Sequence, residues 1–222
     1  MPLIIAIDGP SGAGKSTLGR MLARELNLLY LDTGAMYRAV ALAVLESGVS
    51  TSDARAVAEL AARAKLSLSG DPDSLRVALD GRDVSEDIRT EEVSQTASII
   101  STLPEVRRTL VQRQRELGRE GGVVLEGRDA GTVVFPEADV KFFLTAEPEK
   151  RAERRYEENR MKSRDTSFEQ TLSDISVRDR RDTSRADSPL VPAPDAILID
   201  STELSIQGVF EQMMKAISER LA

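Results

Sequence analysis

The sequence predicts an α/β fold in which a parallel sheet is flanked by helices. Short apolar runs rich in β-branched residues, typical of buried strands, alternate along the chain with stretches whose apolar residues recur at helical spacing. A glycine-rich segment lies between the first strand-like run and the first helical stretch. Strands that alternate with helices form parallel sheets, because each helical crossover returns the chain to the same edge of the sheet.

In the first third of the chain, strands are predicted over residues 3–7 and 28–31, where the apolar runs are short. Helices are predicted around residues 18–26, 36–44 and 54–64, where Leu, Met, Val and Ala recur three and four positions apart. This part of the chain therefore reads as strand, helix, strand and two further helices.

Residues 65–87 predict a small antiparallel ribbon inserted into this pattern. Residues 66–69 and 75–79 both alternate between apolar and polar side chains. A strong turn over residues 70–73 separates them, and Asp80-Gly81 is typical of a second turn.

The rest of the chain returns to alternating helices and strands. Helices are predicted over residues 93–100 and 104–117, and strands over residues 123–125, 140–144 and 196–199. One long, charged helical stretch separates the last two strands. The chain closes with a helix whose apolar stripe consists of Ile206, Val209, Phe210, Met213, Ile217 and Leu221.

The composition fits one domain that spans residues 1–222. Hydrophobic residues make up 41% and charged residues 30% of the 222 positions, which is enough to bury a core and stay soluble. The sequence contains neither Cys nor His. Their absence excludes disulfides, thiolate nucleophiles, Ser-His-Asp hydrolysis and metal sites built on these residues. Any chemistry must use Lys, Arg, carboxylates, hydroxyls and backbone amides.

The charge balance and the apolar runs indicate which partners to expect. The chain has 30 basic and 37 acidic residues and a net charge of −7, so nucleic acid is a poor default partner. Residues 150–185 are nevertheless net basic and are a candidate for holding a small anion. No apolar run reaches the roughly 18 residues of a membrane span, and the N-terminus lacks the basic region of a signal peptide. We expect a cytoplasmic protein with no membrane partner.

A phosphate-binding loop follows the first predicted strand. Its residues are Gly9, Pro10, Ser11, Gly12, Ala13, Gly14, Lys15 and Ser16, followed by Thr17. They fit the pattern of a glycine, four residues and Gly-Lys-Ser/Thr. Glycines let consecutive amides face a polyphosphate, and the positive end of the next helix favours the same ligand.

In this loop, Lys15 can reach the outer phosphates, and the Ser16 hydroxyl can face Mg²⁺ directly or through water. The alternative is a glycine-rich turn that merely joins strand to helix, which the position of the motif disfavours. We therefore expect a sheet of the P-loop NTPase type and a nucleoside triphosphate site. The motif does not specify the reaction, because GTPases, motor ATPases and small-molecule kinases share it.

Polar residues also follow two other predicted strands, at the sheet edge where ligands bind in open α/β folds. After the second strand, Thr33 could cap the next helix and place free amides and Arg38 near an anion. The alternative is an ordinary helix start. After the third strand, Arg128 beside Asp129 is either a structural ion pair or a phosphate ligand next to a base-reading carboxylate.

The densest charge cluster lies at residues 178–185. Arg178, Asp182 and Arg185 fall at helical spacing and can share one face. By itself this pattern is typical of a solvated face with ion pairs. Together with a phosphate loop and the strand-end residues, it favours an anionic acceptor.

Several motifs in combination resemble the bacterial cytidylate kinases, of the nucleoside monophosphate kinase group. These motifs are IDGPSGAGK (residues 7–15), DTGAMYR (32–38), GRDAGTVVFP (127–136), RDRRD (178–182), PLVPA (189–193) and DST (200–202). The resemblance covers essentially the whole chain in order. Two positions depart from it: Ser16 stands where many members have Gly, and Thr33 stands where others have Ser.

The resemblance implies phosphoryl transfer from ATP to CMP, and also to dCMP, in pyrimidine nucleotide metabolism, with Mg²⁺ and by a monomer. It names Lys15, Arg128 and Arg185 as catalytic residues. It further implies that residues 9–17 bind ATP, and that Arg38, Arg128 and Arg185 grip the acceptor phosphate near Thr33.

For the nucleoside of the acceptor, the resemblance implies that Ser98, Arg107 and Asp129 read cytosine. Arg178 and Asp182 would hold the ribose or the adjoining network. On the residues alone, Ser98 could equally be a helical serine and Arg107 a surface arginine.

The resemblance also divides the chain into regions. Residues 35–118 would form the acceptor-binding region with its inserted ribbon, and residues 147–165 a helical lid over ATP. The lid residues that could touch the transferred phosphate are Arg151, Arg154, Arg155 and Arg160. Two other functions are kept as alternatives: a P-loop kinase for another acceptor (UMP, AMP or shikimate), and a non-catalytic nucleotide-binding switch. The switch is disfavoured because the chain lacks an Asn-Lys-x-Asp motif.

Overall fold

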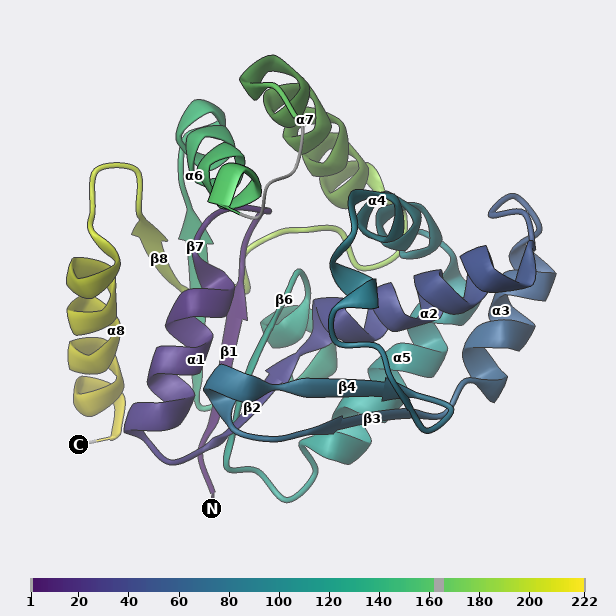
Figure 1. Ribbon diagram of the computed structural model, residues 1–222. Coiled ribbons are helices and arrows are strands. Elements are labelled where there is room, and N and C mark those ends of the chain that lie inside the picture. The colour runs from purple at the N-terminus through teal and green to yellow at the C-terminus, as the bar shows by residue number, and fades with distance from the viewer. Residues whose placement is uncertain (1, 162–165, 222) are drawn as a thin grey trace.

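A parallel sheet forms the centre of the molecule, in a computed structural model that describes residues 2–161 and 166–221. Across this described chain its strands lie in the order β2-β6-β1-β7-β8 (Figure 1). Their bounds are Leu29–Asp32 for β2, Val123–Gly127 for β6, Ile4–Asp8 for β1, Val140–Thr145 for β7 and Ile197–Asp200 for β8. Every neighbouring pair is parallel, as the alternation of strands and helices predicts.

Helices cover both faces of this sheet, and successive residues of β1 serve the two faces in turn. Ile5 and Ile7 pack in one apolar cluster with α1 (Lys15–Glu25) and α8 (Ile206–Leu221). Ala6 between them belongs to a second cluster on the opposite face. This alternation follows from the pleat of a strand, whose neighbouring side chains point to opposite faces.

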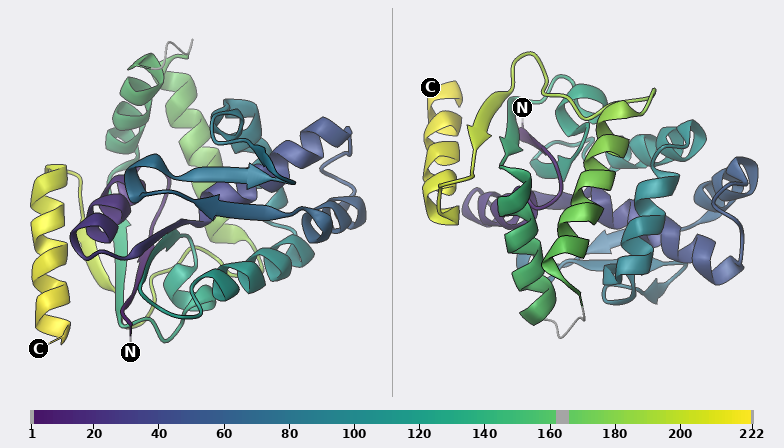
Figure 2. Two further views of the ribbon diagram at one scale, coloured as in Figure 1. Left: turned by 60° about the horizontal axis from the view of Figure 1, so that its bottom comes forward. Right: turned by 90° about the horizontal axis from the view of Figure 1, so that it is seen from above.

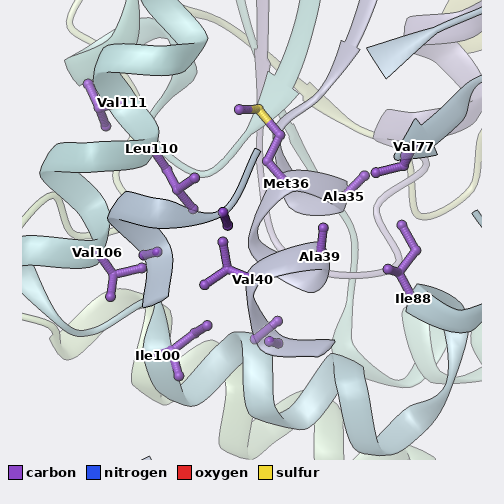
Figure 3. Packing of buried hydrophobic residues seen from close by; sticks show 14 of the residues in the cluster. Ala35, Met36, Ala39, Val40, Val77, Ile88, Ile100, Val106, Leu110 and Val111 are labelled. Atoms are coloured by element: carbon purple, nitrogen blue, oxygen red, sulfur yellow. The ribbon is translucent and has the colours of Figure 1, made fainter. Parts of the chain in front are cut away.

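The second cluster is built around α2 (Thr33–Ser47). Met36 and Val40 of this helix pack against α4 (Glu91–Ile100) and α5 (Pro104–Leu117), with Ile100 and Leu110 close by (Figure 3). The shorter α3 (Ala54–Arg63) contacts α2 and α5 at the edge of this cluster. Of the acceptor-binding residues predicted from the sequence, these helices carry Thr33, Arg38, Ser98 and Arg107.

The inserted ribbon is confirmed and gains a strand. β3 (Leu66–Ser69), β4 (Arg76–Leu79) and β5 (Arg82–Asp83) pair in antiparallel order β3-β4-β5. The turn between β4 and β5 is Asp80-Gly81, with φ angles of 51° and 85°. Positive φ at both positions is what a two-residue hairpin turn requires, and Asp-Gly tolerates it. The short 3₁₀ turns Pro72–Ser74 and Asp87–Arg89 flank this sheet.

The helical character predicted for the long charged stretch is confirmed, and the stretch consists of two helices. Helix α6 spans Pro148–Met161 and α7 spans Phe168–Ser184, and the two lie side by side (Figure 2). Ser167 is the N-cap of α7, because its hydroxyl accepts a hydrogen bond from the amide of Gln170 at 3.1 Å. Residues 162–165 of the expected lid lie outside the described residues.

The closing helix is confirmed, with a narrower apolar stripe than expected. Val209, Met213 and Ile217 of α8 are buried. Ile206 and Leu221, at its two ends, are 39% and 56% exposed. Among the described residues, no helix has the length and apolar character needed to cross a membrane.

Candidate functional site

A large cavity lies at the carboxyl edge of the central sheet. Its volume is about 1160 Å³, and it extends from the glycine-rich loop after β1 to the helices of the acceptor side. The ends of β1, β2 and β6 meet there because these strands are parallel neighbours. Of the residues predicted from the sequence, those that line the cavity are Ser11, Gly12, Gly14, Lys15, Ser16, Thr17, Thr33, Arg38, Ser98, Arg107, Arg128, Asp129, Arg154, Arg155, Arg178, Asp182 and Arg185.

The loop between β1 and α1 has a backbone that only glycine adopts easily. Gly9, Gly12 and Gly14 have φ angles of 145°, 80° and 96°. A Cβ added at Gly9 would lie 2.0 Å from the carbonyl oxygen of Leu144, which leaves no room for any side chain. Helix α1 begins at Lys15 after Gly14, whose missing side chain cannot cap the first amides. Those amides are therefore available to an anion.

The Lys15 side chain is folded into this loop. Its Nζ donates a hydrogen bond to the carbonyl oxygen of Pro10 at 2.7 Å, and the residue is 6% exposed. Burial, followed by the nearby charge of Arg128, lowers the pKa of Lys15 to about 7. A cation held so far from water and so close to another cation favours a polyanionic ligand.

A buried carboxylate lies beneath Lys15, and sequence reasoning missed it. Glu126, near the end of β6, accepts a hydrogen bond from the Tyr30 hydroxyl at 2.6 Å. Burial, and then the charge of Asp32, raises the pKa of Glu126, whereas Lys15 and a hydrogen bond from Ser16 lower it. The signal in the sequence was an acidic residue directly after the predicted strand at residues 123–125, which the sequence analysis did not single out.

Ser16 and Glu126 together fit Mg²⁺. A hydroxyl and a carboxylate are the hard oxygen ligands that Mg²⁺ prefers, and the ion usually takes its other ligands from water and substrate phosphates. Within the described residues, no group of three or more carboxylates could hold a metal by itself. The residues present therefore fit an ion that arrives with a bound polyphosphate.

Asp8 connects the two halves of the site. Its carboxylate accepts hydrogen bonds from the amides of Ala130 and Gly131, each at 2.8 Å. These amides directly follow Arg128 and Asp129, so the bonds fix that segment against the end of β1. Burial raises the pKa of Asp8 to about 6, although the same two amides oppose the shift.

Arg107 and Asp129 form a buried ion pair on the acceptor side. Arg107 also donates to the carbonyl oxygen of Ser101 at 3.3 Å, and its guanidinium lies 5.9 Å from the ring centre of Tyr37. Burial raises the pKa of Asp129, and the charges of Arg107 and Arg185 oppose that shift. Arg107 is thus no surface arginine, which was the alternative left open by the sequence.

Arg128 does not pair with its neighbour Asp129. Its Nε donates to Asp182 of α7 at 2.8 Å, and Arg178 approaches the same carboxylate at 4.0 Å. Although burial opposes ionisation of Asp182, Arg128 and Arg178 lower its pKa. Burial, and then the charge of Arg128, lowers the pKa of Arg178 to about 10. Two guanidiniums thus share one carboxylate, so this wall of the cavity carries a net positive charge.

Arg185 directly follows the last residue of α7, and only some of its hydrogen-bond donors have partners among the described residues. Its Nε donates to the carbonyl oxygen of Ser188 at 2.6 Å. Its Nη2 is buried and, among the described residues, has no hydrogen-bond partner, and neither does the buried hydroxyl of Tyr37. Buried donors without partners are rare, so both groups favour a polar ligand in the cavity.

The expectation that Thr33 caps α2 is wrong. The cap is Asp32, whose Oδ1 accepts from the amide of Ala35 at 2.8 Å. Its Oδ2 accepts from Arg38 at 2.9 Å, and this ion pair positions Arg38 at the cavity. Thr33 is the first residue of the helix, and its hydroxyl donates to the carbonyl oxygen of Glu126 at 2.6 Å. Asp succeeds as a cap because its carboxylate reaches the free amides directly.

The arginines of the expected lid differ in their surroundings. Arg154 and Arg155 line the cavity, where Arg154 donates to the Ser201 hydroxyl at 3.0 Å. Arg151 is buried and bonds the Ser11 carbonyl oxygen at 3.1 Å and Asp179 at 2.6 Å. Arg160 lies 5.9 Å from the Tyr156 ring centre and is not among the lining residues of the cavity.

Ser98 lines the cavity from α4 and accepts a hydrogen bond from Arg181 of α7 at 2.7 Å. Sequence reasoning singled out Ser98 but missed Arg181. Only the charge cluster that contains Arg181 could have drawn attention to it.

Comparison with known proteins identifies the family. The model of the family described as cytidylate kinase matches residues 5–219. The chain is 47% identical to a cytidylate kinase of Geobacter sp. (strain M21), covering 99% of this chain and 94% of that protein. It is 46% identical to the cytidylate kinase of Bacillus subtilis (strain 168), covering 98% of this chain and 97% of that protein.

Solved structures agree in fold. An uncharacterized protein from Eubacterium ventriosum has a TM-score of 0.53 at 14% identity, covering 97% of this chain and 98% of that one. A Thermus thermophilus protein has a TM-score of 0.50 at 21% identity, covering 100% of this chain and 98% of that one.

Replacement of Asp8 by asparagine tests the connection between the two halves of the site. We expect Asp8→Asn to weaken the hold on the segment after β6, because its amide NH₂ cannot accept from a backbone amide. Unfolding of both proteins in urea at pH 5.5 and pH 8 measures the effect.

The folded-state pKa of Asp8 is raised, so the wild-type protein gains stability as the pH falls through about 6. The variant should lack this gain, which is about 1 kcal/mol between these pH values. An identical pH dependence in both proteins would contradict a buried, charged Asp8.

Proposed function

This chain belongs to the cytidylate kinase family, and on that premise we propose that it transfers the γ-phosphoryl group of ATP to CMP, yielding ADP and CDP. We propose dCMP as a second acceptor. One observation carries the assignment of the acceptor. The Arg107–Asp129 pair is 2% and 6% exposed, and it lines the same cavity as the phosphate loop. A buried donor and acceptor side by side suit the edge of one particular base.

ATP would bind with its phosphates in the loop formed by residues 9–17. The free amides at the start of α1 and the Lys15 ammonium supply positive charge where the β- and γ-phosphates would lie. Mg²⁺, held by Ser16, Glu126 and the phosphates, would supply the charge neutralisation that phosphoryl transfer needs. Lys15 would exchange its hydrogen bond to Pro10 for one to a phosphate oxygen.

The acceptor phosphate would be held by Arg38, Arg128 and Arg185. A planar guanidinium donates two parallel hydrogen bonds to phosphate oxygens, which orients the group as well as attracting it. The unsatisfied Nη2 of Arg185 supports this role, because a phosphate oxygen would supply the missing partner. Held in line with the γ-phosphoryl group, the acceptor oxygen attacks without a long search, which is where most of the catalysis arises.

Asp129 would distinguish cytosine from uracil. Its carboxylate accepts from the N4 amino group of cytosine, whereas the O4 of uracil is itself an acceptor and would be repelled. Arg107 would donate to O2 or N3 of cytosine, with Ser98 on the same edge. Asp182 and Arg178 would hold the ribose or its surroundings. Since dCMP keeps the base and the phosphate, it keeps most of these contacts.

No general base is required for this reaction. The oxygen that attacks belongs to a phosphate that is already ionised at neutral pH, so a chain without His can catalyse the transfer. Residues 35–118 would act as the acceptor-binding region. Residues 147–165 would act as a lid that excludes water and suppresses hydrolysis of ATP. Arg154 and Arg155 are better placed than Arg151 and Arg160 to meet the phosphates, because they line the cavity.

The other functions considered from the sequence have less support. UMP and shikimate offer no amino group to the Asp129 carboxylate. AMP offers one, but the family match supports CMP over AMP and over a nucleotide-binding switch. We expect the reaction in the cytoplasm, where ATP and free nucleotides are present. We also expect a monomer to suffice, because all the residues invoked come from one chain.

Steady-state assays of ADP formation with CMP, dCMP, UMP, AMP and shikimate test the proposal. With ATP and Mg²⁺ present, we expect CMP to have the highest kcat/KM, dCMP to follow and the others to fall far below. The physical reason is that each rejected acceptor leaves a buried polar group of the pocket unpaired. Equal turnover of UMP and CMP, or ATP binding without transfer to any acceptor, would refute it.

Replacement of Asp129 by asparagine tests the reading of the base. The amide NH₂ of Asp129→Asn can donate to the O4 of uracil, so we expect the ratio of kcat/KM for CMP to that for UMP to fall at least tenfold, about 1.4 kcal/mol. The KM for ATP should stay within about twofold. The ratio is the useful readout, because loss of the buried partner of Arg107 also lowers stability. An unchanged ratio would exclude Asp129 from base selection.

Replacement of Arg185 by methionine tests the hold on the acceptor phosphate. Loss of the oriented guanidinium should lower kcat/KM for CMP by on the order of 100-fold. Arg185→Lys should lie between this variant and wild type, because it keeps the charge without the planar fork. Melting temperatures of both variants control for folding. Wild-type kinetics in the folded Arg185→Met protein would reduce Arg185 to a structural role.

A further inference from the structure

The hydroxyl of Ser98 makes an unusual contact for a serine within a helix. Such hydroxyls commonly bond back to a carbonyl oxygen one turn earlier. Two nearby serines do so. Ser94 of α4 donates to the carbonyl oxygen of Thr90, and Ser101, directly after α4, donates to that of Ser98, each at 2.9 Å. Ser98 is 4% exposed, and its hydroxyl accepts from Nη1 of Arg181 at 2.7 Å, across 83 positions of sequence.

Arg181 is likewise unusual within its cluster. Its neighbours Arg128 and Arg178 both approach Asp182. In the ranges 2–161 and 166–221, no carboxylate lies within 4.0 Å of the Arg181 guanidinium. Its charge is directed at a neutral hydroxyl, which is a weaker partner than a carboxylate. Arg181 thus makes a hydrogen bond to Ser98 in place of an ion pair, which indicates that the Ser98 hydroxyl must be held in one position.

The direction of approach is also informative. Arg181 lies on the wall of a second cavity, of about 360 Å³, between α4, α6 and α7. It does not line the main cavity, whereas Ser98 lines both. Arg181 therefore reaches Ser98 from the side opposite to the acceptor, and does not itself occupy the acceptor pocket.

We propose that Arg181 is a positioning residue that holds the Ser98 hydroxyl toward the acceptor base. The proposal rests on the function proposed above. A guanidinium is only a donor, so the Ser98 oxygen must accept from it. The single O–H proton and the second lone pair of Ser98 then remain for the ligand. Without Arg181, the hydroxyl could rotate to the carbonyl oxygen of Ser94, as a helical serine commonly does.

The same bond connects the base-reading and phosphate-holding parts of the pocket. Helix α7 carries Arg178 and Asp182, Arg185 directly follows its last residue, and α4, which carries Ser98, packs against α7 (Figure 1). Because Arg181 and Asp182 are adjacent, one short segment of α7 fixes where the base would lie relative to the phosphate. Loss of Arg181 should therefore affect the affinity and selectivity for the acceptor, and not the ATP site.

The experiment is a double-mutant cycle between Arg181→Met and Ser98→Ala, followed by kinetics with CMP, UMP and ATP. If Arg181 acts through Ser98, Arg181→Met should raise the KM for CMP about tenfold and narrow the discrimination against UMP. The kcat and the KM for ATP should stay within about twofold. In the Ser98→Ala background the same substitution should add less than about twofold, because its target is gone.

Two further variants separate positioning from a general effect. Arg180→Met removes the neighbouring, exposed arginine of the same helix and serves as a matched control, with wild-type kinetics expected. Arg181→Lys keeps a charged donor and should recover part of the lost CMP affinity. Melting temperatures of all variants establish that they fold.

The possible results separate the role of Arg181 from the proposed function. Independent, additive effects of the two substitutions, or a change confined to the KM for ATP, would overturn the role of Arg181 while leaving the proposed function intact. An Arg180→Met variant as impaired as Arg181→Met would overturn it too, because a general loss of charge would then explain both. Absence of CMP phosphorylation by the wild-type protein would overturn the proposed function itself.

Discussion

The parallel pairing of β1 with β6 is the constraint on which the site depends. Its register sets Asp8 opposite Gly127, so the glycine-rich loop and the Arg128–Asp129 segment leave the sheet side by side. A slip of one residue would turn Ile5 and Ile7 to the other face and separate the two segments. The bonds from Ala130 and Gly131 to Asp8 hold this register at its functional end. A donor loop and an acceptor pocket encoded far apart in sequence thereby face one cavity.

The cavity is organised around a surplus of cations that the protein only partly compensates. Arg128 and Arg178 share Asp182, Arg38 has Asp32, and Arg185 keeps a buried donor without a partner among the described residues. Burial, and then the charge of Arg128, lowers the pKa of Lys15 to about 7, which is a cost to the fold without a ligand. Anionic nucleotides remove that cost on binding. Stability is thus exchanged for affinity, as is common at functional sites.

The sequence predicted the parts of this molecule that depend on local patterns. The strands, the glycine-rich loop and the Asp80-Gly81 turn follow from spacing and from backbone freedom, which neighbouring residues specify. Contacts across the fold could not be derived in that way. Nothing local indicates that Arg107 would pair with Asp129, or that Arg128 would choose Asp182 over its own neighbour. The division of the charged stretch into α6 and α7 could not be derived from the sequence, because charged residues are frequent in both helices.

The proposed recognition of the phosphate and that of the base would be physically coupled in this pocket. Burial favours the neutral form of Asp129, and Arg107 and Arg185 together favour its charged form, the form that accepts from an amino group. Arg185 also has a buried donor, Nη2, without a partner among the described residues, as do Arg38, Arg107 and Arg178 at Nε, and all four residues line the cavity. When a phosphate draws on the charge of Arg185, Asp129 depends more heavily on Arg107, whose guanidinium is fixed by Ser101 and lies near Tyr37. In the proposed reading of the base, the buried Arg107 would therefore favour the charged form of Asp129 when a nucleotide occupies the site.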